Sequence, residues 1–232
     1  MQISIAAITN AFPAYRVAVV VAENLTIMPQ RPAALDALIA AREAAARARW
    51  GTTELAAVPG IAAWRAAYKA FGIKQTRYRS SVERLLKNVL ADRPLARINA
   101  FVDAYNAVSL QHVLPLGADD LDKVTPPLAF RYAKEGDSFL DMAEEGDAPE
   151  APRLGEVVYA DAAHVLCRRW NWRQDARTLI TPATGRAVVT VQQNGAGDVA
   201  GATADLVDLI QQFCGGTCRF AILDATRPEV DL

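Results

Sequence analysis

The sequence predicts an α+β (mixed α/β) fold in which a helical N-terminal half packs on a mixed, barrel-like β-sheet. Between residues 32 and 115, apolar side chains recur at helical spacing. After Asp122, the chain changes to short apolar runs bounded by Pro, Gly or Asp, namely LAFRYA, EVVYA, HVLCRR and AVVTVQ. With 52% hydrophobic residues over 232 positions, the chain has enough apolar surface for one sizeable core, so we expect a single domain over residues 1–232.

The overall charge excludes a strongly basic nucleic-acid-binding protein. With 25 basic and 26 acidic residues the net charge is −1, so any RNA-binding surface must be local. The three cysteines are an odd number, and the sequence shows neither a charged-then-apolar leader nor an apolar run near the ~20 residues of a membrane span. We therefore expect a cytoplasmic protein with no membrane partner and no DNA partner.

The first part of the chain is predicted to contain two strands and two helices. The runs ISIAAI and RVAVVVAENLTI, with Asn10 and Pro13 between them, predict two strands joined by a turn. Pro32 begins an alanine-rich helix over residues 32–50, because proline fits the first helical turn. Apolar residues at helical spacing predict a second helix over residues 61–71.

Three more helices are predicted further along the chain. Ser80 and Glu83 have the spacing of a capping box, so a third helix is expected to run from there to about residue 90. Asn99 caps a fourth helix, which stops at Pro115 because proline has no N–H. A last helix over residues 203–213 precedes the strand RFAIL.

The fourth helix carries a row of polar side chains. Asp103, Asn106 and Ser109 recur every third residue, whereas Val102 and Tyr105 belong to an apolar face. A polar row within apolar surroundings is typical of a helix that lines a site.

The aspartates that follow this helix allow two interpretations. Asp119, Asp120 and Asp122 offer oxygen ligands to a divalent cation. Aspartates after a helix also form caps, because Asp bonds its own backbone two residues on, and this interpretation is favoured. The glycine run NGAGDVAG lacks the full dinucleotide fingerprint. We therefore predict no metal site and no cofactor.

The segment CRRWNWRQDARTLIT combines arginines with tryptophans. Its charged and aromatic residues include Arg168, Arg169, Trp170, Trp172, Arg173 and Arg177. Arginines bind phosphates, and indole rings provide surfaces on which unpaired RNA bases stack. Alternatively, the guanidinium groups pack on the indoles and pair with acids such as Asp175. The sequence leaves both interpretations open.

Three stretches together resemble a known family. The helix INAFVDAYNAVSLQHVLPLGADDLDK, the preceding WRAAYKAFGIKQTRYRSSVERLLKNVL and the following GEVVYADAAHVLCRRWNWRQDARTLIT resemble the B3/B4 domain of the phenylalanyl-tRNA synthetase beta subunit and its free-standing relatives, over about residues 63–193. In the synthetase, this domain hydrolyses the ester of tyrosine wrongly attached to phenylalanine tRNA. The resemblance implies that the partner is the aminoacylated acceptor end of a tRNA.

The resemblance also implies candidate roles for individual residues. The family's pattern of an acid, an Asn and a Pro falls on Asp103, Asn106 and Pro115, while Gly117 and Thr190 stand where the synthetase has a histidine and a glutamate that help position substrate or water. The candidate catalytic residues are Asn106, Asp103, Gly117 and Thr190. The candidate substrate-binding residues are Pro115, Leu116, Ser109, Trp170 and Asn171, and the candidate RNA-binding residues are Arg168, Arg169, Arg173, Arg177 and Trp172.

Two functions follow from these residues and the resemblance. The first is a free-standing editing protein that binds aminoacyl-tRNA and hydrolyses mismatched aminoacyl esters in trans. The alternative is a non-catalytic module that binds tRNA or an amino-acid-like molecule. A weaker third hypothesis is a metal-dependent hydrolase that uses the three aspartates. Both RNA hypotheses require the polar row and the segment from Arg168 to Trp172 to open onto one cleft.

Overall fold

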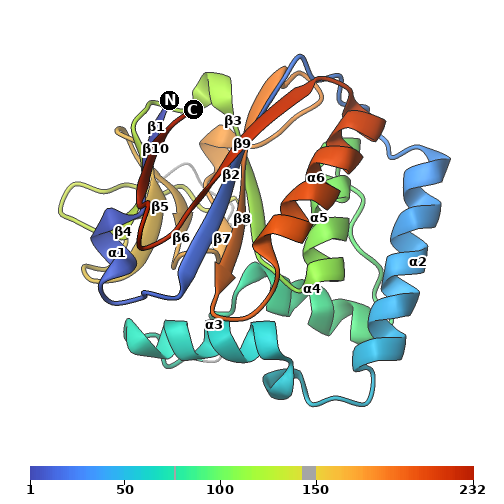
Figure 1. The fold of residues 1–232 in the computed structure, drawn as a ribbon, viewed down its shortest axis with the longest axis horizontal. Helices are drawn as coiled ribbons and strands as arrows, with labels where there is room; N and C mark the ends of the chain where they lie inside the picture. Colours follow the sequence, from blue (N-terminus) through green and yellow to red (C-terminus); the bar gives the residue numbers. More distant parts are fainter. Residues whose placement is uncertain (76, 143–149) are drawn as a thin grey trace.

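Two β-sheets and a layer of helices form the described part of the chain, residues 1–75, 77–142 and 150–232 of a computed structural model (Figure 1). The smaller sheet has the strand order β3-β8-β2-β9 and is antiparallel throughout. The larger has the order β10-β1-β4-β5-β6-β7 and is mixed, because β1 and β4 are parallel. The predicted α+β class is confirmed. Instead of a barrel-like sheet, the described residues form two separate open sheets.

The strands are short except for the two at the centre of the smaller sheet. That sheet contains β2 (Tyr15–Glu23), β3 (Leu116–Asp120), β8 (Arg186–Asn194) and β9 (Thr217–Leu223). The larger sheet contains β1 (Gln2–Ser4), β4 (Leu128–Tyr132), β5 (Val157–Ala160), β6 (Val165–Arg168), β7 (Arg173–Gln174) and β10 (Glu229–Asp231). The four runs that predicted strands after Asp122 all contain one, whereas β3, β7 and β10 were not predicted.

Strand β2 is buried on both faces. Ala18 and Val20 pack into the core that the helices cover, while Val17 and Val19 pack into a second core against the larger sheet. A strand covered on both sides gains burial at every position, which explains the nearly continuous apolar run RVAVVVA.

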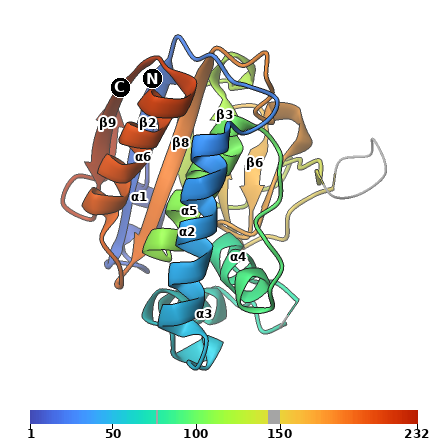
Figure 2. The same ribbon diagram turned by 90° about the vertical axis from the view of Figure 1, so that its right-hand side faces the viewer.

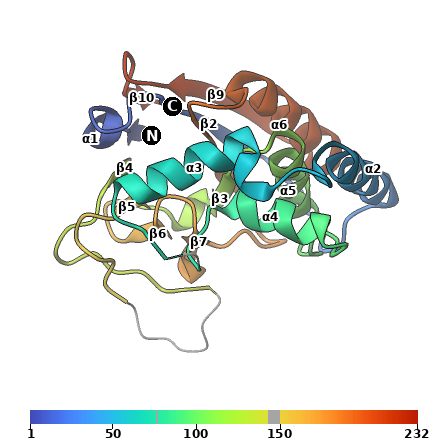
Figure 3. The same ribbon diagram turned by 90° about the horizontal axis from the view of Figure 1, so that it is seen from below.

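Most helices cover one face of the smaller sheet. In Figures 1 and 2, α5 (Ala100–His112) and α6 (Val199–Cys214) lie nearer the sheet than α2 (Ala33–Trp50). Helices α3 (Pro59–Ala70) and α4 (Ser81–Leu90) cross one end of the fold, as the view from below shows (Figure 3). All five predicted helices are present. None of the helices in the described residues has the length and apolarity to cross a bilayer.

Helix α6 begins four residues before its predicted start. The carboxylate of Asp198 accepts a hydrogen bond of 3.0 Å from the backbone N–H of Gly201, which caps the helix at Asp198. The glycine run NGAGDVAG therefore forms a loop and the first turn of this helix.

Both strands predicted at the start of the chain are present, but the connection between them is more than a turn. Residues Ala6–Thr9 form the short helix α1, and β1 and β2 belong to different sheets. Ile5, Ile8 and Phe12 are all buried, and their spacing of three and four residues places them on one side only in a helical turn. Helical spacing thus overrides the strand-like appearance of the second half of ISIAAI.

The predicted capping box at the start of α4 does not form, although the helix begins where expected. Ser80 makes no capping hydrogen bond. The carboxylate of Glu83 lies 2.7 Å from Arg65 Nη2 and 3.1 Å from Arg79 Nε. Two guanidinium groups hold Glu83 more strongly than a backbone N–H would, because hydrogen bonds between charged groups are the stronger ones.

Candidate functional site

A cavity of about 350 Å³ lies between helices α4 and α5 and strands of both sheets. Leu85, Tyr105, Leu116 and Tyr159 give it apolar surface, and polar side chains such as Asn106 interrupt that surface. Its size and mixed lining are typical of a small-molecule site, for which volumes of ~300–1,000 Å³ are usual.

Gly117 and Thr190 lie opposite each other in this cavity. They are cross-strand partners on β3 and β8, and both line the space. A Cβ atom added to Gly117 would meet no heavy atom within 4 Å. The absence of a side chain at Gly117 therefore enlarges the cavity beside the Thr190 hydroxyl.

Pro115 and Gly117 belong to a segment that is hydrogen-bonded to β8. Helix α5 ends at Val113, which adopts a left-handed conformation with φ 53°. The carbonyl of Pro115 then accepts a 3.0 Å hydrogen bond from the N–H of Gln192, and Leu116 begins β3. Leu116, Gly117 and Thr190 line the cavity, whereas Pro115 only anchors the start of the strand.

A chain of side-chain hydrogen bonds leads to the Thr190 hydroxyl. Tyr68 Oη donates to Asn171 Oδ1 (3.0 Å), Asn171 Nδ2 donates to Gln192 Oε1 (3.1 Å), and Gln192 Nε2 donates to Thr190 Oγ1 (3.2 Å). Every bond donates in the same direction, so Thr190 accepts and keeps its own O–H proton. Within the described residues that proton has no acceptor, so it remains for a bound molecule.

The polar row on α5 does not face one site. Asp103 is buried, with Oδ1 accepting from the Ile98 N–H (3.0 Å) and Oδ2 lying 3.0 Å from Arg31 Nε; burial raises the pKa of this carboxyl. Ser109 donates to the carbonyl of Leu114 at 2.7 Å. Only Asn106 lines the cavity. Three residues turn a helix by about 300°, so a row at this spacing rotates away from any single site.

Trp170 lies in the core and not in the cavity. Its ring is fully buried, with centroids 4.6 Å from Phe12, 4.9 Å from Tyr15 and 5.2 Å from Trp64. The next residue, Asn171, lines the cavity instead. The structure therefore separates two neighbouring residues that the sequence placed in one substrate-binding set.

All four arginines of the arginine-rich segment contact acids or aromatic rings within the described residues, as the packing interpretation predicted. Arg168 pairs with Glu156 (2.9 Å) and with Glu150, and Arg177 pairs with Asp175 (2.6 Å). The guanidinium groups of these two arginines therefore form ion pairs within the protein, as the packing interpretation predicted.

Arg169, Trp172 and Arg173 form a stack beside the cavity. The Arg169 guanidinium lies 3.7 Å from the Tyr78 ring centroid and 4.4 Å from that of Trp172, and Arg173 lies 4.5 Å from Trp172. Arg173 also pairs with Asp141 at 2.6 Å. Of these three, Trp172 and Arg173 line the cavity itself.

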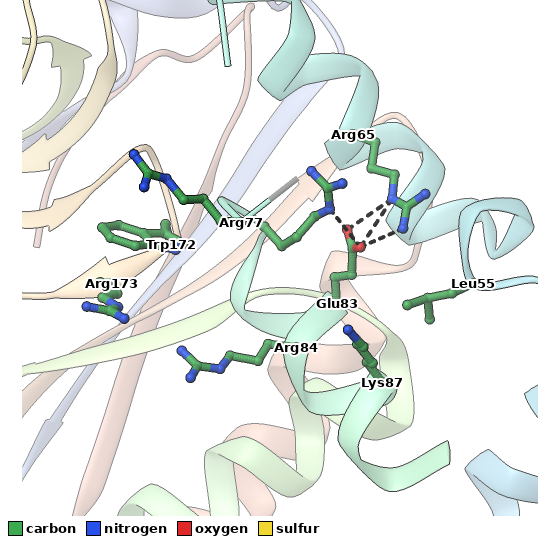
Figure 4. Close-up of a pocket in the computed structure, with 9 residues that line it drawn as sticks. Leu55, Arg65, Arg77, Glu83, Arg84, Lys87, Trp172 and Arg173 are labelled. Atoms are coloured by element: carbon green, nitrogen blue, oxygen red, sulfur yellow. Dashed lines mark hydrogen bonds and ion pairs between the residues drawn. The ribbon is translucent and has the colours of Figure 1, made fainter. Parts of the chain in front are cut away.

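A strongly basic hollow of about 540 Å³ adjoins the cavity (Figure 4). It shares Arg84, Trp172 and Arg173 with the cavity. We call its cationic lining the basic rim, which consists of Arg65, Arg77, Arg79, Arg84, Lys87 and Arg173.

The exposed charges of the basic rim are Arg77, Arg84 and Lys87. Glu83 pairs with Arg65, as the dashed lines in Figure 4 show, and also with Arg79. Arg84 and Lys87 make no ion pair with any described residue. Sequence reasoning missed these residues because they come from α4 and the loop before it, outside the arginine-rich segment; their spacing on one helical face was the available signal.

The three aspartates after α5 have separate partners. Asp120 Oδ1 accepts from the Asp122 N–H (3.1 Å), which confirms the predicted cap, and Asp122 pairs with Arg186 (3.1 Å). Asp119 alone lines the cavity. No group of three or more His, Cys, Asp or Glu side chains in the described ranges is placed to hold a metal ion.

Asp119 is an ionisable group of the cavity whose pKa is shifted to near neutral pH. Its pKa is raised to about 7: burial is the largest cause, hydrogen bonds from Thr178 and Gln174 oppose the rise, and the nearby carboxylates of Asp175 and Asp161 add to it. A carboxyl with this pKa changes charge near neutral pH. Burial also raises the pKa of Tyr105 and of the Cys167 thiol, which keeps both groups neutral there.

Fold and cavity together define an α+β protein with a ligand site between its helical layer and its sheets. The model of the B3/4 domain matches residues 63–215, and the chain belongs to that family. The resemblance predicted from the sequence is therefore confirmed, and the match extends past residue 193 to include α6.

One solved structure is similar to this chain. It is an N-terminal fragment of the phenylalanyl-tRNA synthetase beta-subunit from Pyrococcus horikoshii, with 12% identity and a TM-score of 0.48. The match covers 94% of this chain and 50% of that one, so the present chain spans about half its length. A comparison with curated proteins gives no match.

Proposed function

We propose that this protein binds the aminoacylated 3′ end of a tRNA and hydrolyses mismatched aminoacyl esters in trans. The observation that carries the proposal is that a partly apolar cavity adjoins the basic rim. The cavity and the basic hollow share Arg84, Trp172 and Arg173 as lining residues. Membership of the B3/4 domain family, to which the sequence resemblance assigns tRNA editing, supports the same reaction. We place this reaction in the cytoplasm and in one domain.

In this proposal the basic rim binds phosphates of the acceptor end. Arg77, Arg84 and Lys87 are exposed, so binding a phosphate costs them little desolvation and releases counterions. Trp172 and Tyr78 offer aromatic surface for unpaired bases next to these charges. The aminoacyl group then enters the cavity.

In this proposal the protein accelerates ester hydrolysis by positioning the ester and the attacking water. The Asn106 amide and the Thr190 hydroxyl donate to the ester carbonyl or to the attacking water, and one oxyanion donor contributes ~10²–10³-fold in typical enzymes. Holding water against an ester supplies up to ~7–11 kcal/mol without a covalent intermediate. Neither Gly117 nor Thr190 is an acid or base, so the reaction relies on donors and orientation.

A panel of mischarged tRNAs tests the proposal. The chain is incubated with each aminoacyl-tRNA, and loss of the ester is compared with spontaneous loss and with loss in the presence of the Asn106→Ala variant. We expect at least one ester to be cleared faster than spontaneously by the wild type and about 10²–10³-fold more slowly by the variant than by the wild type. Clearance at the spontaneous rate for every ester would refute the deacylase.

The second candidate is a binding module without catalysis. It is favoured by Gly117 and Thr190, which supply no acid or base at the positions where the resemblance implies a histidine and a glutamate. Salt-dependent tRNA binding without hydrolysis would support this alternative. Absence of any salt-dependent RNA affinity would exclude both functions.

A further inference from the structure

Buried carboxylates in this protein commonly have an arginine partner. A cation offsets the cost of removing a carboxylate from water, and an unpaired buried charge is expensive. The pairs are Arg65 with Glu83, Arg131 with Asp137, Arg168 with Glu156, Arg177 with Asp175, and Arg31 with Asp103.

Among the described residues, Asp119 and Glu43 are buried carboxylates without a cationic partner, and of these two only Asp119 lines the cavity. Asp119 is 3% exposed, and its hydrogen bonds come from two neutral donors, Thr178 Oγ1 (2.6 Å) and Gln174 Nε2 (3.0 Å). Both bonds end on Oδ1. Across the described ranges no Lys, Arg or His side chain pairs with this carboxylate, and no donor reaches Oδ2. Asp119 is thus a buried acid in a cavity, with no cation of its own.

The charges of the site are arranged in two zones. Arg84 and Arg173 are the cations that line both the cavity and the hollow beside it. Asp119 is the only carboxylate among the described residues that line the cavity. A ligand that complements this arrangement carries negative charge at the end outside the cavity and positive charge at the end inside it.

An aminoacyl ester of a 3′-terminal nucleotide has this distribution of charge. Its phosphates lie on the nucleotide side of the ester, and its α-ammonium lies on the other side. We propose that Asp119 binds the α-ammonium group of the aminoacyl ligand, with Oδ2 as the acceptor. This inference rests on the proposed function and adds a specificity-determining residue to it.

The raised pKa of Asp119, about 7, agrees with a missing counter-ion. Desolvation is its largest cause, and Asp175 and Asp161 add to it. A bound ammonium favours the charged carboxylate and lowers the pKa again. The protein would then recognise every aminoacyl group by the amine that all of them share, while the apolar lining selects among side chains.

Two non-hydrolysable probes test the inference. The first is 3′-amino-3′-deoxyadenosine 5′-phosphate joined to L-alanine through an amide, and the second is the same nucleotide joined to propionate, which lacks the amine. Affinities for both are measured at pH 8 by calorimetry. The wild type is expected to bind the alanyl probe at least about 10-fold more tightly than the propionyl probe.

The Asp119→Asn variant keeps the Oδ1 acceptor for Thr178 and Gln174 and removes only the charge. In this variant the two probes are expected to bind within about 2-fold of each other. Asp122→Asn is the matched control, because Asp122 is exposed and lies outside the cavity; it should keep the wild-type ratio. A ratio near one in the wild type, or an unchanged ratio in Asp119→Asn, would overturn the inference.

Further outcomes distinguish amine recognition by Asp119 from the proposed function as a whole and from a role of Asp119 in proton transfer. If neither probe binds while a mischarged tRNA is still cleared, the inference fails alone; if neither probe binds and no ester is cleared, the proposed function fails with it. An α-hydroxyacyl-tRNA lacks the α-ammonium group. If Asp119→Asn slows hydrolysis of aminoacyl-tRNA and of α-hydroxyacyl-tRNA equally, with KM unchanged, then Asp119 transfers a proton and recognition of the amine is refuted.

Discussion

Gly117 on β3 lies directly opposite Thr190 on β8, and the space beside this pair belongs to the cavity. The missing side chain at Gly117 and the short one at Thr190 together set how much of a ligand fits there. The cavity therefore depends on the pairing of β3, at one edge of the smaller sheet, with β8.

Filling the space at Gly117 should remove activity without harming the fold. Gly117→Val places its Cβ where no atom lies within 4 Å, and valine suits a strand better than glycine. We expect a melting temperature equal to or slightly above that of the wild type and at least about 10-fold slower ester clearance.

Gly185→Val is the control for this substitution. Gly185 also has open space around its Cβ position and does not line the cavity. Equal losses in both variants, measured by melting curves and by the clearance assay, would show that the effect at Gly117 is not one of cavity volume.

Asp119 should make stability depend on pH. Its pKa is raised from the ordinary 3.8 to about 7 in the folded protein, so the folded state holds the proton more tightly than the unfolded chain. Its contribution to stability is complete below pH ~4 and is lost as pH rises through about 7. Asp119→Asn should therefore melt about 8–16 °C above the wild type at pH 8, with little difference at pH 4.

The check is a series of melting curves between pH 4 and 8 on the wild type, Asp119→Asn and Asp122→Asn. A melting-temperature difference between wild type and Asp119→Asn that stays constant across this range would contradict the raised pKa. Asp122→Asn should follow the wild type.

Arg84 should contribute to affinity for any tRNA through charge alone. It is exposed, lines the cavity and the basic hollow, and pairs with no described carboxylate. Arg84→Gln should reduce the slope of log Kd against log salt by about one and weaken binding uniformly among tRNAs. Arg227→Gln, at an exposed position away from the site, should leave the slope unchanged.

The two tryptophans near the cavity should behave oppositely. Trp170→Leu leaves a void at the centre of a ring of aromatic side chains and should cost about 2–4 kcal/mol of unfolding free energy. Trp172→Leu should cost less than ~1 kcal/mol but weaken binding of a single-stranded acceptor end by about 5–100-fold, through lost stacking. Denaturant unfolding and tRNA binding measure the two effects. The reverse pattern would place Trp170 in the site.

Local sequence patterns predicted the helices and most strands because those elements bury a regular apolar face. Asn99, for example, accepts from the Val102 N–H at 2.9 Å and begins α5 as expected. Strand β3 was missed because Gly117 and Asp119 face the cavity, which removes the apolar alternation that identifies a strand.

The site was only partly predictable because its residues meet across the fold. The resemblance identified Asn106, Gly117 and Thr190, which the structure brings to one cavity. Asp103 and Ser109 have polar partners within the core, a distinction that spacing along a helix does not carry. Arg84 was not singled out from the sequence, which grouped Asp119 with Asp120 and Asp122; only the fold, which places α4 and β3 beside the arginine-rich segment, brings Arg84 and Asp119 to the cavity.

Strand β2 has a consequence for how the chain acquires its structure. It pairs along its whole length with β8, from Tyr15 opposite Asn194 to Glu23 opposite Arg186, and along its other edge with β9. A ribosome must synthesise almost the entire chain before this central strand finds either neighbour, and contacts so distant in sequence slow folding. Because β8 also carries Thr190, a nascent chain has no complete cavity until its sheet closes.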